Sequence, residues 1–141
     1  MSRFQYVNNN PKGKDTSDCV IRAFVTALAL DAKTIMYELT ECYITTGYFI
    51  NEPRCYNNYL KRKGYIKCKQ LRKPDRKKYT AEEFCTYLDN SDIQGPVVAH
   101  VGIGHISVFV NSGTPTSKNY QLNDTWDCTD KCVGNYWVRR T

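Results

Sequence analysis

The length and composition of the chain are those of one small globular protein. Its 141 residues suffice for a single domain, expected to span residues 1–141, with a core that needs no covalent cross-link. The apolar fraction of 41% and the charged fraction of 24% are ordinary for a folded protein and argue against intrinsic disorder. No run of about eighteen apolar residues is present, and residues 1–10 lack the apolar stretch of a secretory signal. We therefore expect a cytoplasmic protein that does not span a membrane.

The cysteines predict free thiols rather than a disulfide framework. Their number, seven, is odd, and no C-x-x-C pair is present. In a reducing cytoplasm most of them are expected to stay unpaired. Cys128 and Cys132 are separated by three residues, but this spacing is loose for structural zinc and no partner pair lies nearby. We expect neither a metal ion nor an organic cofactor.

Positive charge is concentrated in one tract, residues 61–78. The tract holds ten basic residues and one acid, Asp75, whereas the whole chain has a net charge of +6. Such a tract is able to follow a polyanion such as a nucleic-acid backbone. The alternative is a solvated edge strand whose lysines discourage aggregation. No nucleic-acid-binding motif accompanies the tract.

Hydrophobic periodicity predicts helices in the first half of the chain. After a short strand over residues 4–7, three helices are expected, over residues 19–30, 31–43 and 53–64. Asp31 is the expected N-cap of the second helix, and Pro53 suits the first turn of the third. The apolar face of the second helix is expected to consist of Ile35, Met36, Leu39 and Tyr43.

Strand patterns dominate the second half. A strand over residues 65–71 precedes a helix over 80–88, which the capping box of Thr80 and Glu83 opens. Further strands are expected over residues 96–101, 105–110, 119–124 and 133–139. The Gly-Ile-Gly segment at 102–104 joins the first two of these in a hairpin. Helices followed by an antiparallel sheet predict an α+β fold.

Cys19 is the candidate nucleophile. It follows the possible N-caps Asp15, Ser17 and Asp18, so it is expected at the start of a helix, where the dipole and unpaired amides stabilise a thiolate. At 100° per residue the main apolar face consists of Val20, Ile21, Phe24, Val25 and Leu28. Cys19 falls on the opposite side of the helix, with Ala23, Thr26 and Leu30. A second layer of structure packed on that side would form a cleft beside Cys19. The alternative reading of Cys19 is a buried structural cysteine.

His105 is the candidate base for this thiol. It directly follows the Gly-Ile-Gly turn and begins a predicted strand, which would hold the imidazole rigidly in an open position. The competing histidine is His100, which lies within the preceding strand and is better explained as a core or edge residue.

Asp124 is the candidate group that orients the imidazole. It ends the strand that follows the His105 strand, and neighbouring antiparallel strands bring such positions together. Asp127 is the second choice. Either carboxylate has an alternative role as a turn residue that caps backbone amides.

The order of these residues resembles the papain-like cysteine peptidases. The resemblance rests on DCVIRAF at residues 18–24, HISVFV at 105–110 and DTWD at 124–127. It points to small papain-like proteins of phages and bacteria, and the Asp-Cys start is similar to that of bacteriocin-leader peptidases. It implies a nucleophile helix packed on a C-terminal antiparallel sheet, a triad of Cys19, His105 and Asp124, and a peptide or protein substrate. The compartment would then be the cytoplasm, or the host cytoplasm for a phage protein.

One feature of that family is missing here. Papain-like peptidases usually place a Gln about six residues before the nucleophile to bind the oxyanion, and this chain has Gly13 there, with Gln5 too early. The possible substitutes are Asn10, Lys14, Thr16 and Ser17, together with the amide of Cys19. We expect a hydrolase that cleaves a peptide or other amide or thioester bond. The alternatives are a weak or inactive relative that binds and inhibits a host protein, and a nucleic-acid binder that uses residues 61–78.

Overall fold

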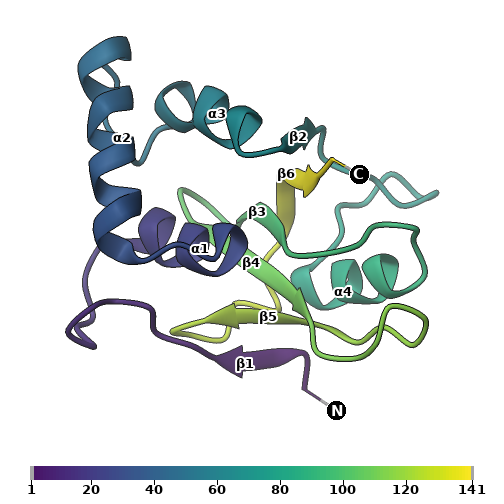
Figure 1. The fold of residues 1–141 in the computed structure, drawn as a ribbon. Coiled ribbons are helices and arrows are strands. Elements are labelled where there is room, and N and C mark those ends of the chain that lie inside the picture. The colour runs from purple at the N-terminus through teal and green to yellow at the C-terminus, as the bar shows by residue number, and fades with distance from the viewer. Residues whose placement is uncertain (1, 141) are drawn as a thin grey trace.

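A computed structural model of the chain describes residues 2–140. Four helices and six strands make a mixed α+β fold in which all strands belong to one sheet, in the order β1-β5-β4-β3-β6-β2 (Figure 1). In chain order the elements are β1 (Phe4–Tyr6), α1 (Cys19–Leu28), α2 (Ala32–Thr46), α3 (Pro53–Arg62), β2 (Tyr65–Cys68), α4 (Ala81–Asp89), β3 (Val97–Val101), β4 (Ile106–Asn111), β5 (Tyr120–Asp124) and β6 (Val133–Arg139).

The sheet is antiparallel except at one edge. β3 and β4 form the expected hairpin, β5 pairs with β4, and β6 pairs with both β3 and β2. β1 instead runs parallel to β5, with Phe4 opposite Leu122 and Tyr6 opposite Asp124. The expectation of a purely antiparallel sheet was therefore wrong at this edge. A parallel pair is possible here because the long connection through the helices lets β1 and β5 run in the same direction.

Helices cover both faces of the sheet. α1, α2 and α3 lie on one face, where they pack against Val98, Ile106, Val108 and Trp137. α4 covers the other face and packs against Val97, Ala99, Phe109 and Tyr136 (Figure 1). Successive residues of β3 alternate between these two cores, as the period of two of a strand requires. Because both faces are covered, the central strands β3 and β4 are apolar almost throughout.

Most predicted elements are present with slightly different ends. The capping box of Thr80 and Glu83 opens α4 as expected. The first helix ends at Leu28, two residues earlier than predicted, because Ala29 turns into the left-handed region at φ 54°. The strand that begins at Tyr65 ends at Cys68 instead of residue 71. The seven cysteines form no disulfide with one another, which confirms the expectation of free thiols.

The buried faces of two helices differ from the prediction. In α1 the buried residues are Val20, Ala23, Phe24 and Ala27, whereas Ile21, Val25 and Leu28 are only partly buried. The small alanines let the helix lie close to β4, so the side of α1 that carries Cys19 faces the sheet. In α2 the buried residues are Ile35, Leu39 and Cys42, while Met36 and Tyr43 are exposed. None of the helices within residues 2–140 is long and apolar enough to cross a membrane.

Candidate active site

Cys19 is the first residue of α1, and its position leaves the first-turn amides free. The preceding Asp18 is the N-cap residue, but its side chain caps no backbone amide. Its carboxylate instead accepts hydrogen bonds from Arg22 Nε at 2.7 Å and Asn10 Nδ2 at 2.8 Å. The first amides of a helix have no partner within the helix and carry its positive dipole. The half-buried thiol of Cys19 therefore lies where negative charge is stabilised.

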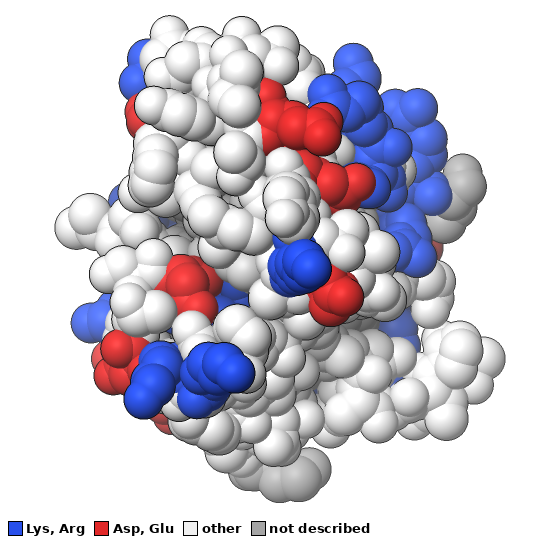
Figure 2. All heavy atoms as spheres, turned by 60° about the vertical axis from the view of Figure 1, so that its left-hand side comes forward, with Lys and Arg blue, Asp and Glu red and all other residues white. Residues whose placement is uncertain are grey.

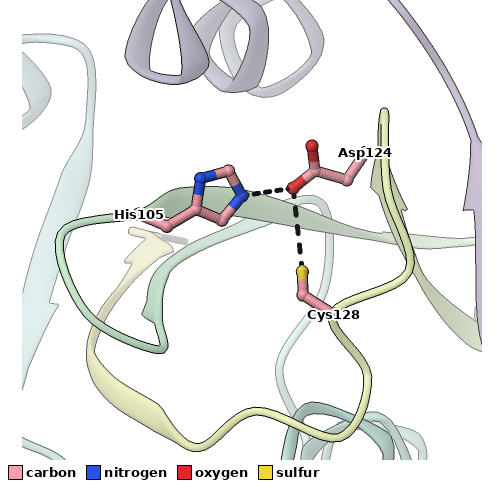
Figure 3. A group of neighbouring side chains, drawn as sticks. All are labelled: His105, Asp124 and Cys128. Carbon is pink, nitrogen blue, oxygen red and sulfur yellow. Dashed lines mark hydrogen bonds and ion pairs between the residues drawn. The ribbon is translucent and has the colours of Figure 1, made fainter. Parts of the chain in front are cut away.

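His105 lies immediately before β4, at the end of the β3–β4 turn. Gly102 and Gly104 in this turn have φ values of 69° and 66°, which other residues rarely adopt. His105 Nε2 lies 2.6 Å from Asp124 Oδ2, and the other ring nitrogen is turned away from that carboxylate (Figure 3). Because Nε2 is used by Asp124, Nδ1 is the nitrogen left for the thiol of Cys19.

Asp124 ends β5 and is almost completely buried, with 4% of its surface exposed. Besides His105 it accepts hydrogen bonds from Ser107 Oγ at 2.6 Å, the Thr125 amide at 2.7 Å and Arg22 Nη1 at 3.1 Å. Asp127, the second choice, is exposed and accepts hydrogen bonds from Thr129. The structure thus brings Asp124 and not Asp127 to the imidazole.

His100 has a different environment from His105. Its Nε2 lies 3.3 Å from Tyr56 Oη, and its ring centroid is 5.4 Å from that of Trp137. Burial and the nearby Lys67 lower the pKa of His100. This histidine belongs mainly to the core between β3 and α3, although one side of it reaches the cleft described below.

The electrostatic environment favours a thiolate and an imidazolium. Burial by itself would raise the pKa of Cys19, but the imidazole of His105, the amide of Ile106 and the charge of Arg22 together bring the pKa below its ordinary value. Burial by itself would lower the pKa of His105, but Asp124, with the thiols of Cys128 and Cys19, raises it to about 11. The pKa of Asp124 is likewise held low by donors, against burial. All three shifts favour the charged form of the group concerned.

Sequence reasoning missed three residues that support Asp124. Arg22 follows Asp18 by one helical turn, so it bridges Asp18 and Asp124 with one side chain. Ser107 follows His105 by two residues, a spacing that puts both on one side of the strand. Cys128 is buried, and its Sγ lies 3.9 Å from Asp124 Oδ2 (Figure 3). The spacings of Arg22 and Ser107 were visible in the sequence. The position of Cys128 next to Asp124 depends on the turn that follows β5.

His105, Asp124 and Cys128 are the one group of potential metal ligands within the described residues, with ligand atoms within 4.8 Å of one another. The arrangement does not suit a cation. The 2.6 Å contact between His105 and Asp124 leaves no space for an ion between them, and the guanidinium of Arg22 already neutralises the carboxylate at 3.1 Å. Cys132, the other half of the Cys128 pair considered above, is exposed and outside this group.

A cleft of about 430 Å³ opens beside the thiol and the imidazole. Its walls come from the loop before α1, the start of α3 and the segment after β5, and include Thr16, Ser17, Asn51, Pro53, His100 and Trp126. The Trp126 ring lies 5.3 Å from the His105 ring and covers one side of it. Of the four substitutes for the missing Gln, Thr16 and Ser17 line the cleft, whereas Asn10 and Lys14 do not.

Comparisons with known proteins identify no relative: no family model, curated protein or solved structure matches this chain. The class of the protein therefore follows from its fold and the geometry of its site. It is an α+β protein with a half-buried cysteine at a helix start and a buried His–Asp pair beside the same cleft.

Proposed function

We propose that the chain is a cysteine hydrolase of the papain-like kind that cleaves a peptide or another amide or thioester bond. The observation that carries the proposal is the 2.6 Å contact of His105 with the buried Asp124, beside a cysteine at a helix N-terminus whose pKa is lowered. A nucleophilic thiol needs a base within reach and a third group that orients the base. Cys19 and His105 line the same cleft, and Asp124 orients His105, in the order that the resemblance implies.

In the proposed reaction the Cys19 thiolate attacks the carbonyl carbon and forms a C–S bond. The carbonyl oxygen becomes an oxyanion, and the His105 imidazolium gives its Nδ1 proton to the leaving nitrogen as the C–N bond breaks. Water then attacks the thioester while His105 accepts a proton, and breaking of the C–S bond releases the acid and restores the thiolate. Asp124 holds the ring orientation throughout and stabilises the imidazolium in the steps in which His105 carries the proton.

The oxyanion would be bound by the amide of Cys19 together with a hydroxyl of Thr16 or Ser17. The amide belongs to the free first turn of α1, and both hydroxyl residues line the cleft. One missing oxyanion donor costs about 10²–10³ in turnover. Replacing Thr16 and Ser17 one at a time by Ala would show which hydroxyl takes this role.

Limiting iodoacetamide over roughly pH 4 to 9 tests the thiolate, with mass mapping of the modified cysteine. We expect Cys19 to react first, with an apparent pKa well below the free-thiol value of about 8.5. His105→Ala should remove this advantage, and His100→Ala serves as the matched control that keeps it. If iodoacetamide labels Cys19 no faster than it labels the exposed Cys132, the proposal is wrong.

A second candidate function is a papain-like protein that binds a host protein without turnover. It is favoured by the absence of the Gln that binds the oxyanion in papain-like peptidases. In this chain the hydroxyls of Thr16 and Ser17 line the cleft instead. The two candidates differ in one measurement. If a pool of peptide substrates is cleaved no faster by the wild type than by Cys19→Ala while Cys19 still reacts selectively with iodoacetamide, the binding role is the better one.

A further inference from the structure

A second pocket, of about 360 Å³, lies between α3 and the edge strand β2, apart from the catalytic cleft. Its lining comes from the C-terminal half of α3, from β2 and from the end of the chain: Asn57, Asn58, Lys61, Tyr65, Ile66, Lys67, Trp137 and Arg140. None of these residues lines the cleft beside Cys19. A volume above about 300 Å³ is in the range of small-molecule sites. The proposed hydrolase reaction gives this pocket no role.

Two polar atoms in the wall of this pocket are buried without a hydrogen-bond partner. They are Trp137 Nε1 and Asn57 Oδ1, and they are the two such side-chain atoms found within residues 2–140. Trp137 itself is only 1% exposed. Leaving a buried donor or acceptor unpaired costs about 1–3 kcal/mol, so native proteins rarely do so without a reason. A ligand that reaches this wall would satisfy both groups.

The Asn57 amide can offer either of its ends to such a ligand. A half-turn of the amide exchanges Oδ1 and Nδ2 with little change in shape. With Nδ2 inward, the indole N–H of Trp137 and the amide N–H of Asn57 are two donors in one wall. Two neutral donors beside cations form a suitable surface for an anionic oxygen.

Two cations of the basic tract, Lys61 and Lys67, line the pocket, and neither makes an ion pair within residues 2–140. Lys63 pairs with Glu38 at 3.1 Å, and Lys73 pairs with Glu83 at 2.8 Å, so both are engaged elsewhere. Lys61, Lys67 and Arg140 line the pocket, and no acidic residue within residues 2–140 lines it. Lysine and arginine side chains gather along the upper right edge of the face in Figure 2. The ammonium of Lys67 lies 5.9 Å from the centre of the Trp137 ring, and both residues line the pocket.

We propose that this pocket binds the phosphate group of a small phosphorylated molecule. Lys61, Lys67 and Arg140 would neutralise the phosphate, and the N–H groups of Trp137 and Asn57 would donate to its oxygens. The pocket has more space than one phosphate fills, so a mononucleotide fits it better than the free ion. The proposal does not depend on the hydrolase activity, because the two sites share no lining residue.

The test uses the indole N–H signals of the ¹⁵N-labelled protein, since the chain has only two tryptophans. Trp126→Phe assigns the two signals. Adenosine monophosphate, inorganic phosphate and a single-stranded oligonucleotide are titrated separately, at constant ionic strength set with sodium chloride. We expect the Trp137 signal to shift saturably with adenosine monophosphate while the Trp126 signal stays in place. A smaller shift with inorganic phosphate would support the same site.

Matched variants locate the binding. Lys61→Gln and Lys67→Gln change exposed side chains, and Asn57→Asp adds a negative charge without changing the size of the side chain. Each should weaken adenosine monophosphate binding at least tenfold, whereas Lys33→Gln on the distant helix α2 should leave it unchanged. No saturable shift of the Trp137 signal would overturn the proposal. Binding of the oligonucleotide alone, weakened equally by Lys67→Gln and by Lys77→Gln, would also overturn it, because the tract would then be a diffuse polyanion surface.

Discussion

Asp124 is the residue at which most hydrogen bonds of the candidate site meet. It lies at the end of β5 and holds His105 and Ser107 at the start of β4 and Arg22 in α1, two distant parts of the chain. A carboxylate so buried stays ionised only because these donors compensate for the loss of water. Its neighbours therefore control the charge state of the imidazole, and through it that of the thiol.

Replacing Ser107 by Ala removes one hydrogen bond to Asp124 and so tests whether the neighbours of Asp124 affect the charge state of the thiol. Ser107 Oγ donates to Asp124 Oδ2 at 2.6 Å, and a hydrogen bond to a charged group is worth about 1.5–3 kcal/mol. We expect the alkylation rate of Cys19 near pH 6 to fall about tenfold, because 1.4 kcal/mol corresponds to that factor. Ser117→Ala, in an exposed loop, is the control. Equal pH profiles for both variants would show that Ser107 has no influence on the triad.

At the scale of elements, pairing in the sheet brings the start of β4 next to the end of β5, and the start of α1 packs beside them. β4 begins directly after His105 and pairs with β5, which ends at Asp124, while α1 packs on β4 and begins at Cys19. The alanines of α1 permit this close approach. α4 lies on the opposite face and supports the same strands from behind.

The capping box of α4 is the element whose stability is most directly testable. The Thr80 hydroxyl accepts from the Glu83 amide at 3.2 Å, and Glu83 Oε1 accepts from the Thr80 amide at 3.0 Å. We expect Thr80→Ala to lower the free energy of unfolding in urea by about 1 kcal/mol. Thr116→Ala, at an exposed position, should stay within about 0.5 kcal/mol of the wild type. A Thr80→Ala protein as stable as this control would mean that the box contributes little.

At the scale of the whole molecule, charge is arranged in separate places. The buried pairs Arg22–Asp18, Arg22–Asp124 and His105–Asp124 lie around the cleft, while the unpaired cations Lys61, Lys67 and Arg140 lie around the second pocket. Two of the ten cations of the basic tract, Lys63 and Lys73, are paired with Glu38 and Glu83.

The lowered pKa of Cys19 links global stability to pH. A group whose pKa is lower in the folded than in the unfolded chain adds stability above its unfolded value, about 8.5 for a free thiol, and loses it as the pH falls through the folded value. The difference in unfolding free energy between the wild type and Cys19→Ala should therefore shift in favour of the wild type as the pH rises toward 9. Urea unfolding at several pH values measures it. A difference independent of pH would contradict a perturbed thiol at position 19.

The local elements and the three site residues were predictable from the sequence because they depend on neighbours along the chain. Helical and strand periodicity, the capping box at Thr80 and the glycine turn before His105 are all signals of short range. They placed Cys19, His105 and Asp124 at the ends of elements, which is where the structure has them. The α+β class followed from the order of those elements.

Contacts between distant segments were decided only by the tertiary structure. The parallel edge strand β1, the bridge of Arg22 to Asp124 and the contact of Cys128 with Asp124 each join residues whose proximity no local pattern encodes. The second pocket is of the same kind, because Asn57, Lys67 and Trp137 meet only when β6 pairs with β2 beneath α3. Periodicity specifies which side of an element is apolar, whereas packing of whole elements specifies which side chains meet.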